Sequence, residues 1–342
     1  MLTIAVDGMG GDHAPHEIVR GVGEALDRNP GKCHLMLVGK KDQLESELSA
    51  IGKLNHPDLT IVHASEVVRM EDSPAAAIRS KRDSSINVAV DLVKKGKAQA
   101  VFSAGNTGAA VASTVLKLRT LTGIERPGIG TVFPSPTGRF LLLDAGANVD
   151  SKPIHLVHYA IMGDAYARSI LNMPNPRIGV LSVGEEDSKG NELTRETFRI
   201  LKTIPDINFV GNVEGHDLFA ETVDVVVCDG FVGNVVLKCC ESLAKALGHI
   251  IKQKLKKTVI RKAGYLLSRN AYRELKQLSD VDEYGGAPLL GVNGVCIIGH
   301  GSTSARGVRN GLRVAGEVVE QRVNDHILER VKHLGMGSGK PA

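Results

Sequence analysis

Three glycine-rich segments of the chain have the residue types that bind phosphate. The first has the sequence DGMGGDHAP and begins at Asp7, with Gly10 and Gly11 in its centre. A glycine-rich turn between a strand and a helix exposes backbone N–H groups and directs a helix N-terminus at an anion. The dinucleotide-binding pattern needs a third glycine near His13, so we do not expect NAD binding. Two interpretations remain open: a ligand-binding turn that uses Asp7, Gly10 and Gly11, or a tight turn in which Asp7 and Asp12 cap the backbone.

The second segment, SAGNTGA, begins at Ser103 and again follows a short apolar run. Its small residues would let a phosphate approach the backbone. Ser103, Asn106 and Thr107 can donate hydrogen bonds to phosphate oxygens. A helix cap formed by Asn106 or Thr107 would need fewer polar residues than the segment contains, so we favour phosphate contact.

The third segment, GHGSTS, follows the apolar run at residues 295–298. His300 could bind phosphate or transfer a proton, because an imidazole titrates near neutral pH. Gly301 and Ser302 complete the candidate phosphate contacts. The alternative is that His300 is a turn residue hydrogen-bonded to the backbone.

Two further loops carry side chains that could act in a binding or catalytic site. GEEDSKGN places Lys189 among acids, where it could supply a cation to a binding site, although composition alone favours a solvated loop. CDGFVGN places Asp229 at the end of an apolar strand, the usual catalytic position in α/β enzymes. Asn234 could donate to an oxyanion or cap the next helix. Cys228 could be a nucleophile, but a cysteine that ends an apolar strand more often packs in the core.

The composition excludes several classes of protein. With 42% hydrophobic residues and a mean hydropathy of −0.03, the chain is expected to be globular, and no apolar stretch is long enough to span a bilayer. A net charge of +4 is too small to indicate nucleic-acid binding. The five cysteines include no CxxC pair, and no signal peptide precedes the first strand, so a reduced, cytoplasmic location is expected. His155 and His158 lack a third ligand of matching type, so neither a metal nor another cofactor is expected.

Short apolar runs alternate with helical periodicity along the chain. This alternation predicts an α/β fold with a mostly parallel sheet in three layers and helices on both faces. The predicted strands are residues 3–6, 34–38, 59–62, 100–102, 130–133, 140–143, 178–182, 207–210, 223–228 and 295–298. The predicted helices are residues 17–27, 41–48, 87–95, 109–118, 153–171, 194–203 and 305–331.

The chain is expected to fold as a single catalytic unit over residues 1–333, either compact or with two lobes and a cleft. The strands at 130–133 and 140–143, joined by PSPTG, are expected to form a hairpin at an antiparallel edge of the sheet. Residues 334–342 are expected to form a flexible tail.

Residues 235–280 interrupt the alternation, because apolar residues recur there only at helical spacing. A break around 264–267 and a second helix from about Asn270 predict a helical hairpin that projects from the body. Its outer face carries the basic residues Lys238, Lys245, Lys252, Lys256 and Lys257. The tip could insert into an anionic membrane surface through Arg261, Lys262, Tyr265, Leu266, Leu267 and Arg269. The alternative is that the apolar stripe on the hairpin is an interface between two copies of the chain.

Taken together, these motifs resemble a known family. AVDGMGGDHAP, SAGNTGA, GEEDSKGN, CDGFVGN and GAPLLGVNG–IIGHGS resemble the bacterial phosphate acyltransferases of phospholipid synthesis, the PlsX family. The likeness extends from Ile4 to about Glu320. It implies a fold related to phosphotransacetylase and isocitrate dehydrogenase, and a homodimer. It also implies acyl carrier protein and inorganic phosphate as partners, and an acyl phosphate product used by a membrane glycerol-3-phosphate acyltransferase. Within this resemblance Lys189 and Asn234 become the catalytic candidates.

The chemistry that the resemblance implies is transfer of a long acyl group from a carrier thioester to phosphate. Phosphate is already largely dianionic near neutral pH, and a thiol of pKa about 8.5 is an acceptable leaving group. The site must therefore aim a polyanion at a carbonyl and stabilise an oxyanion, without a metal or a covalent intermediate. Two alternatives remain open, an acetyl-CoA:phosphate acetyltransferase and a non-catalytic, membrane-docked nucleotide-binding regulator.

Overall fold

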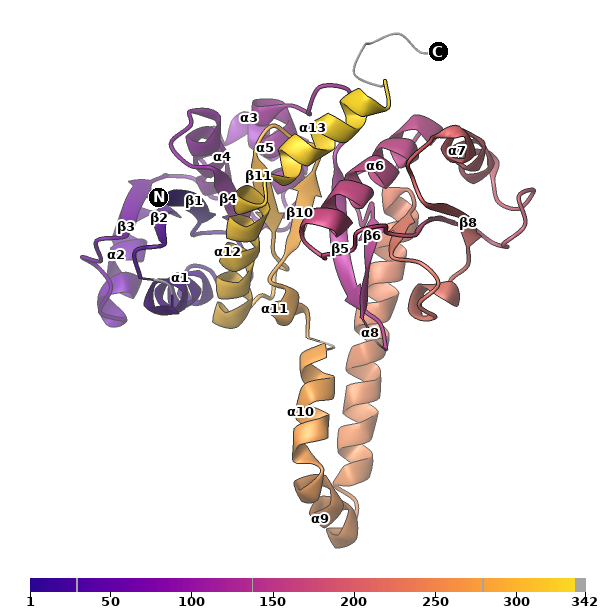
Figure 1. Ribbon diagram of the computed structural model, residues 1–342. Coiled ribbons are helices and arrows are strands. Elements are labelled where there is room, and N and C mark those ends of the chain that lie inside the picture. Colours follow the sequence, from indigo (N-terminus) through magenta and orange to yellow (C-terminus); the bar gives the residue numbers. More distant parts are fainter. Residues whose placement is uncertain (29, 137, 279, 336–342) are drawn as a thin grey trace.

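The computed structural model describes residues 1–28, 30–136, 138–278 and 280–335. Most of the expected tail, residues 336–342, lies outside the described residues. The predicted fold class is confirmed: a long sheet forms the middle layer, and helices cover both of its faces (Figure 1).

Eleven strands of the described residues form one sheet in the order β3-β2-β1-β4-β11-β10-β5-β6-β9-β7-β8. They are β1 (Leu2–Asp7), β2 (Cys33–Gly39), β3 (Leu59–His63), β4 (Ala100–Ser103), β5 (Gly128–Pro134), β6 (Arg139–Leu143), β7 (Ile178–Leu181), β8 (Phe209–Val213), β9 (Val225–Val227), β10 (Ala287–Leu290) and β11 (Val295–Ile298).

The sheet consists of two parallel blocks that run in opposite directions. Strands β3, β2, β1, β4 and β11 pair in parallel, and so do β6, β9, β7 and β8. Between the blocks, β10 is antiparallel to both β11 and β5, and β5 is antiparallel to β6. Consequently the carboxyl ends of the strands in the two blocks lie on opposite sides of the sheet. Here an edge means such a row of strand ends and not an outermost strand.

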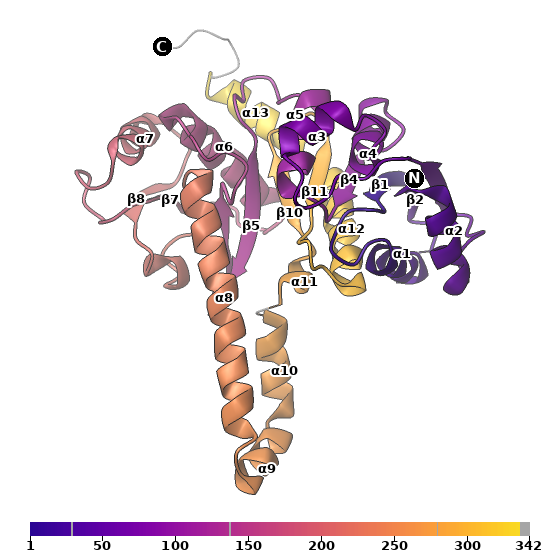
Figure 2. The same ribbon diagram turned by 180° about the vertical axis from the view of Figure 1, so that it is seen from behind.

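Alternating side chains of the strands supply the cores on the two faces. In β1, Ile4 and Val6 pack into one core cluster, and Ala5 between them packs into another. The first core lies under α1 (His16–Arg28), α2 (Lys41–Ala50), α6 (Pro153–Ser169), α12 (Ala305–Glu320) and α13 (Val323–His333). The second lies under α3 (Pro74–Ser80), α4 (Ser85–Lys94) and α5 (Thr107–Leu118), which stand in front of the sheet in Figure 2.

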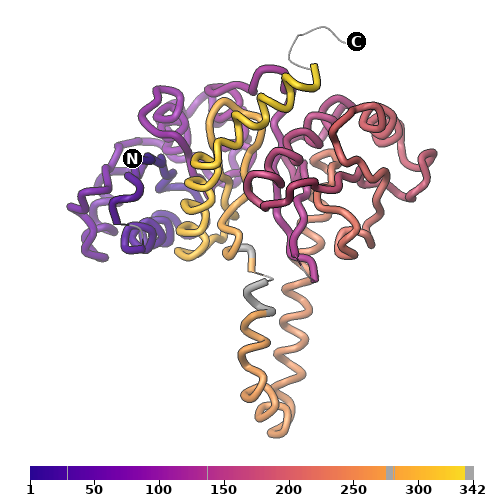
Figure 3. The backbone as a smooth tube through the Cα atoms, viewed as in Figure 1, coloured from indigo at the N-terminus to yellow at the C-terminus, as the bar shows by residue number. Residues whose placement is uncertain are grey.

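A helical hairpin projects from the body, as predicted (Figure 3). It consists of α8 (Gly230–Leu255), α9 (Val259–Leu267) and α10 (Arg269–Leu278), with α9 at its tip. No helix of the described part of the chain is both long and apolar enough to cross a membrane.

The predicted break around 264–267 falls one residue early, because α9 extends to Leu267 and α10 begins at Arg269, next to the predicted start at Asn270. A second break, which was not predicted, separates α8 from α9 before Thr258, whose hydroxyl accepts the backbone N–H of Arg261 at 3.3 Å and caps α9. A single glycine, here Gly264, costs a helix only about 1 kcal/mol.

Other sequence predictions differ from the structure where contacts between distant residues determine the secondary structure. The strands at 130–133 and 140–143 do form a hairpin, but neither is an outermost strand, because β10 pairs with β5 and β9 pairs with β6. The helix predicted at 305–331 is broken at Arg322, whose φ of 49° ends α12 before α13 begins. Helix α7 (Glu192–Thr203) was predicted. Strand β10 and helices α3 and α11 (Val281–Tyr284) were not predicted.

Candidate active site

The three predicted phosphate-binding turns meet at one edge of the sheet. They follow β1, β4 and β11, which are neighbours in the first parallel block. The N–H of Asp12 donates to the carbonyl of Gly301 at 2.8 Å, and the N–H of Gly299 donates to the carbonyl of Ser103 at 2.8 Å. A Cβ atom on Gly10 would lie 2.8 Å from the nitrogen of Gly105, so only glycine permits this approach. We call residues 7–12, 103–107 and 299–302 the glycine cradle.

A buried carboxylate lies beneath the glycine cradle. Asp7 is 3% exposed, and its Oδ2 accepts the hydroxyl of Ser103 at 2.7 Å. Its Oδ1 also accepts the N–H of Met9 at 3.3 Å, the backbone capping that the sequence left open. Burial raises the pKa of Asp7, whereas hydrogen bonds from Ser85 and Ser103 lower it. Asp7 therefore joins the first two turns from below, and the Ser103 hydroxyl proton is committed to it.

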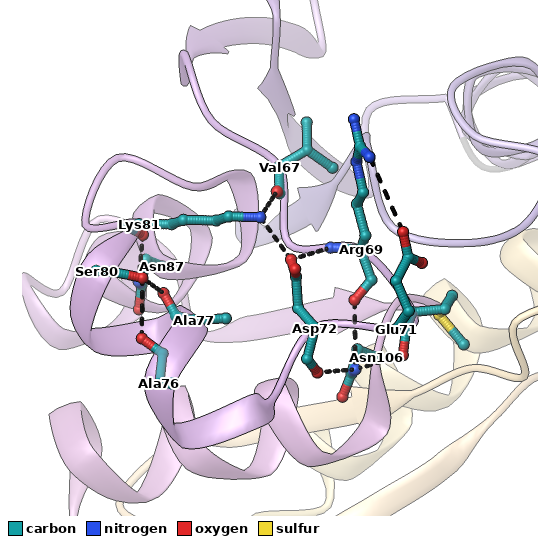
Figure 4. A network of polar contacts seen from close by, with 11 residues as sticks. Val67, Arg69, Glu71, Asp72, Ala76, Ala77, Ser80, Lys81, Asn87 and Asn106 are labelled. Carbon is teal, nitrogen blue, oxygen red and sulfur yellow. Dashed lines mark hydrogen bonds and ion pairs between the residues drawn. The ribbon is translucent and has the colours of Figure 1, made fainter.

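Asn106 connects the glycine cradle to the loop before α3 (Figure 4). Its amide donates to the carbonyls of Met70 at 2.9 Å and Asp72 at 3.2 Å. Its Oδ1 accepts the N–H of Ala109 at 3.0 Å, which makes Asn106 the N-cap of α5. Asp72 is itself paired with Lys81, and this hydrogen bond holds the pKa of Asp72 below its usual range. The polar groups of Asn106 thus serve the fold, whereas Thr107 is exposed at the start of α5.

Helix α8 passes the glycine cradle and brings a lysine to it. The Nζ of Lys238 lies 3.3 Å from Nε2 of His300 and 3.0 Å from Oε2 of Glu241. The Nδ1 of His300 lies 2.9 Å from the hydroxyl of Ser302. Burial, and then the charge of Lys238, lower the pKa of His300, so the imidazole is neutral near pH 7. Nε2 accepts from Lys238 when the ring proton is on Nδ1, which then donates to the hydroxyl of Ser302, and in this tautomer the backbone N–H of Ser302, 3.2 Å from Nδ1, has no acceptor on the ring.

Lys238 was not identified as a site residue from the sequence, which placed it on the outer face of the hairpin. One signal could have found it: Lys238 follows Asn234 by four residues and therefore shares its face of the helix.

The start of α8 is fixed by Asp229. Its Oδ1 accepts the N–H groups of Phe231 and Val232, each at 3.0 Å, so Asp229 is the N-cap of the helix. The capping interpretation of Asn234 is therefore wrong, because Asn234 lies one turn inside α8. Its side chain is exposed.

A loop that the sequence reasoning missed packs against Asn234. Asp144 is fully buried after β6 and accepts N–H groups from Ile129 at 2.9 Å and Asn148 at 2.8 Å, while burial raises its pKa. A Cβ atom on Gly146 would lie 3.5 Å from Cβ of Asn234, and one on Gly233 would lie 1.9 Å from the carbonyl oxygen of Asp144. The loop thus determines where Asn234 stands. Its sequence, DAGAN after an apolar strand, has the same character as SAGNT and could have been recognised.

Lys189 is exposed in the loop after β7, with its stem over Gly184. Because β7 pairs in parallel with β9, this loop begins beside the start of α8. Its strand belongs to the second block, whereas the glycine cradle belongs to the first. Among the described residues, no hydrogen bond or ion pair joins Lys189 to Asn234 or to the glycine cradle.

The remaining reactive side chains have structural partners. Cys228 is buried with its Sγ 3.6 Å from the carbonyl of Asp144, and burial raises the pKa of its thiol well above the usual range, so it is not an activated nucleophile. His155 lies 3.2 Å from Glu125, and burial lowers the pKa of His158 to about 4. Elsewhere, ligand atoms of Glu185, His216 and Asp217 lie within 4.8 Å of one another, a grouping common among surface acids.

A pocket of about 520 Å³ opens beside the glycine cradle, between the start of α1 and the turn before α12. It is lined by His13, Ala14, His16, Glu17, Ser302 and Ser304.

Comparisons with known proteins identify the family of the chain. The model of the fatty acid synthesis protein family matches residues 2–326. A phosphate acyltransferase of Geotalea uraniireducens is 49% identical over 331 residues, which cover 97% of this chain and 94% of that protein. A phosphate acyltransferase of Geobacter sulfurreducens is 50% identical with the same coverage.

Solved structures show the same fold at low identity. A phosphotransacetylase from Streptococcus pyogenes has a TM-score of 0.56 at 15% identity, covering 97% of this chain and 94% of that one. A branched-chain phosphotransacylase from Enterococcus faecalis has a TM-score of 0.58 at 17% identity, covering 93% and 99%.

The first prediction concerns the hydrogen bond between Ser103 and Asp7. Ser103→Ala should lower the free energy of unfolding by about 1–3 kcal/mol at neutral pH, because it leaves a buried carboxylate with one donor fewer. Removing the donor raises the pKa of Asp7 further. The difference in unfolding free energy between wild type and variant should therefore shrink as the pH falls, because Asp7 becomes protonated in both folded proteins. Denaturant unfolding at about pH 7.5 and about pH 4.5 measures this. Ser302→Ala, at an exposed serine, is the control; an equal loss in both variants would contradict the assignment.

Proposed function

The chain belongs to the fatty acid synthesis protein family, together with the phosphate acyltransferases that it matches, and is an acyltransferase; from this we propose the reaction. We propose that it transfers a long-chain fatty acyl group, reversibly, from acyl carrier protein to inorganic phosphate. The acyl phosphate product would serve phosphatidic acid and phospholipid synthesis through a membrane glycerol-3-phosphate acyltransferase.

One structural observation supports the phosphate half of the proposal most directly. The glycine cradle is formed by three turns that each precede a helix, since α1, α5 and α12 begin there. Each helix N-terminus carries roughly half a positive charge, although one N–H of α12, from Ala305, already donates to Oε2 of Glu17, and one of α5, from Ala109, donates to Asn106. Three such ends on neighbouring strands favour a small polyanion over a neutral ligand.

The acyl-transfer step needs few protein groups. A phosphate oxygen forms a bond to the thioester carbon, and the carbon–sulfur bond then breaks. Monohydrogen phosphate carries the proton that the departing thiolate requires, so no external acid is consumed. We assign the proton transfer to His300, because a neutral imidazole can accept from the phosphate hydroxyl and donate to the sulfur.

Stabilisation of the oxyanion in the tetrahedral intermediate is assigned to Asn234. Its exposed amide is a donor held by close packing against Gly146 and by the fixed start of α8 at Asp229. Lys189 is proposed to orient phosphate, the role that the family resemblance implies. Its loop begins beside the start of α8.

A direct assay tests the reaction. Purified protein, acyl carrier protein thioester and phosphate should yield acyl phosphate and free carrier thiol, and release should require phosphate. EDTA should not inhibit, because no step uses a metal. Equal release without phosphate would make the protein a thioesterase. A preference for acetyl-CoA would favour the acetyltransferase alternative, and nucleotide affinity without turnover would favour the regulator.

Substitution of the two proposed catalytic residues is the next prediction. Lys189→Ala and Asn234→Ala should each lower turnover by about 100-fold, the usual loss when one oxyanion donor is removed. Steady-state kinetics at saturating substrates measures the effect, and circular dichroism checks folding. Lys97→Ala and Asn55→Ala, both at exposed positions, are matched controls. Normal turnover in a folded variant removes that residue from the mechanism.

The helical hairpin supports two further parts of the proposal. Beyond its first turn, α8 has no fully buried residue, although Val236, Leu237 and Cys240 pack partly buried against the body. It exposes the apolar side chains Val235, Leu243, Leu247, Ile250 and Ile251. A stripe of this length needs a partner, and we propose a second copy of the chain, which makes the protein a homodimer.

The tip of the hairpin is proposed to contact lipid at the inner face of the cell membrane. In α9, Leu266 is 64% exposed and Leu267 is 89% exposed, and Tyr265 is exposed beside them. The flanking cations Arg261, Lys262 and Arg269 are exposed as well. Each cation close to an anionic leaflet contributes about 1 kcal/mol. Peripheral association would deliver a labile acyl phosphate to an enzyme in the membrane.

Vesicle binding tests the tip. The wild-type protein should co-sediment with vesicles of anionic phospholipid at low salt and less at high salt. Leu266→Glu/Leu267→Glu should bind several-fold more weakly, because charges replace the inserted side chains. Leu116→Glu, at an exposed leucine of α5, is the control. Unchanged binding in the double variant would rule out the tip as the anchor.

A further inference from the structure

Helix α8 carries a polar row that faces the glycine cradle. Asn234, Lys238, Glu241 and Lys245 follow one another at spacings of four, three and four residues, which places them on one face of the helix. Contacts confirm the direction of this face, because Lys238 lies 3.3 Å from His300 and Glu241 lies 3.8 Å from the same ring nitrogen. The row therefore connects the proposed oxyanion donor to the glycine cradle.

We propose that Lys238 is the cation that binds inorganic phosphate at the glycine cradle, and that Glu241 positions it there. The proposal rests on the proposed function, since it names the group that holds the acceptor substrate. Nothing in the sequence motifs or in the names of the related proteins assigns a role to either residue.

The two side chains differ in exposure in a way that fits these roles. Glu241 is 10% exposed, so its carboxylate is enclosed between α8 and the body, and its Oε2 holds the ammonium of Lys238 at 3.0 Å. Lys238 is 51% exposed, so its ammonium keeps open directions for a second anion. An ammonium has three donors, and His300 and Glu241 use two of them. The third is available to a phosphate oxygen.

The position of Lys238 also suits the charge of the ligand. Backbone N–H groups and helix ends cradle phosphate, but each supplies only a partial charge. The glycine turns themselves contain Asp7 and Asp12, which repel a dianion. A full positive charge is therefore needed at this edge, and Lys238 is the cation of the described residues that contacts a cradle side chain directly. Lys189 follows β7 of the opposite block, so it would orient the same phosphate from the side where α8 starts, and Lys238 would hold it at the strand ends of the glycine cradle.

A positively charged group beside His300 has a second effect. The ammonium of Lys238 favours the neutral imidazole, with a lone pair on Nε2 facing it. Phosphate bound to the third donor of Lys238 lies beside this ring, and its hydroxyl donates to the Nε2 lone pair once Lys238 no longer donates to it. Binding of the acceptor and removal of its proton would thus occur at adjacent atoms, whereas the oxyanion donor Asn234 lies one turn earlier on the helix.

The test compares three variants of the full-length protein. Lys238→Gln should raise KM for phosphate about 10- to 100-fold, the usual weight of a hydrogen bond to a charged group, and leave KM for the acyl carrier thioester near the wild-type value. Lys238→Arg should recover part of this loss, because the charge is kept. Lys252→Gln, at an exposed lysine farther along α8, is the matched control.

Two readouts separate phosphate binding from a structural role. Inorganic phosphate should raise the melting temperature of the wild type and of Lys252→Gln, but not of Lys238→Gln. Glu241→Gln, which breaks the same ion pair and keeps the lysine, should lose less phosphate affinity than Lys238→Gln. Equal losses in the two variants would make the pair structural and overturn the proposal, as would an unchanged KM for phosphate in Lys238→Gln. If the wild type formed no acyl phosphate, the proposed function would fail, while the thermal shift with phosphate would still test Lys238.

Discussion

A sheet made of two opposed parallel blocks cannot bring all of its strand ends to one edge. Here β10 and β5 reverse the strand direction, so the turns after β1, β4 and β11 lie at one edge and those after β6, β9 and β7 at the other. Helix α8 resolves this constraint. It starts at the second edge, runs back beside the sheet and passes the first, where Lys238 meets His300. At 1.5 Å per residue its 26 residues span about 39 Å, long enough to continue into the hairpin.

Two buried carboxylates fix the two loops that α8 contacts, one at each edge of the sheet. Asp7 collects hydrogen bonds under the glycine cradle, and Asp144 collects them under the loop that packs on Asn234. Both carboxylates are out of water, which is costly unless several donors compensate. Each therefore fixes the turn around it, because moving any donor away leaves a buried acceptor unpaired. Rigid turns of this kind keep backbone N–H groups aimed at a ligand before it arrives.

The hairpin shows how one element can serve two surfaces. The first turns of α8 are committed to the body and to the glycine cradle, whereas the later turns expose an apolar stripe and α9 exposes its leucines. A substitution in α8 can therefore act on catalysis, on association or on membrane contact according to its position. This arrangement also places α9, the proposed membrane contact, at the end of α8 that lies away from the body (Figure 1).

The sequence by itself determined the alternation of strands and helices, the projecting hairpin and the three turns that form the glycine cradle, because apolar periodicity and glycine position are local properties. It could not predict β10, whose four residues become a strand only by pairing with β11 and β5. Nor could it predict that Asp229 rather than Asn234 caps α8, or that Asp144 supports Asn234. Lys238 was assigned to the outer face of the hairpin, since its spacing from Asn234 puts both on one face of the helix but does not show which turn lies opposite that face. Which lysine meets the glycine cradle was decided by the reversal of the sheet and the path of α8, and these depend on contacts between residues far apart in the chain.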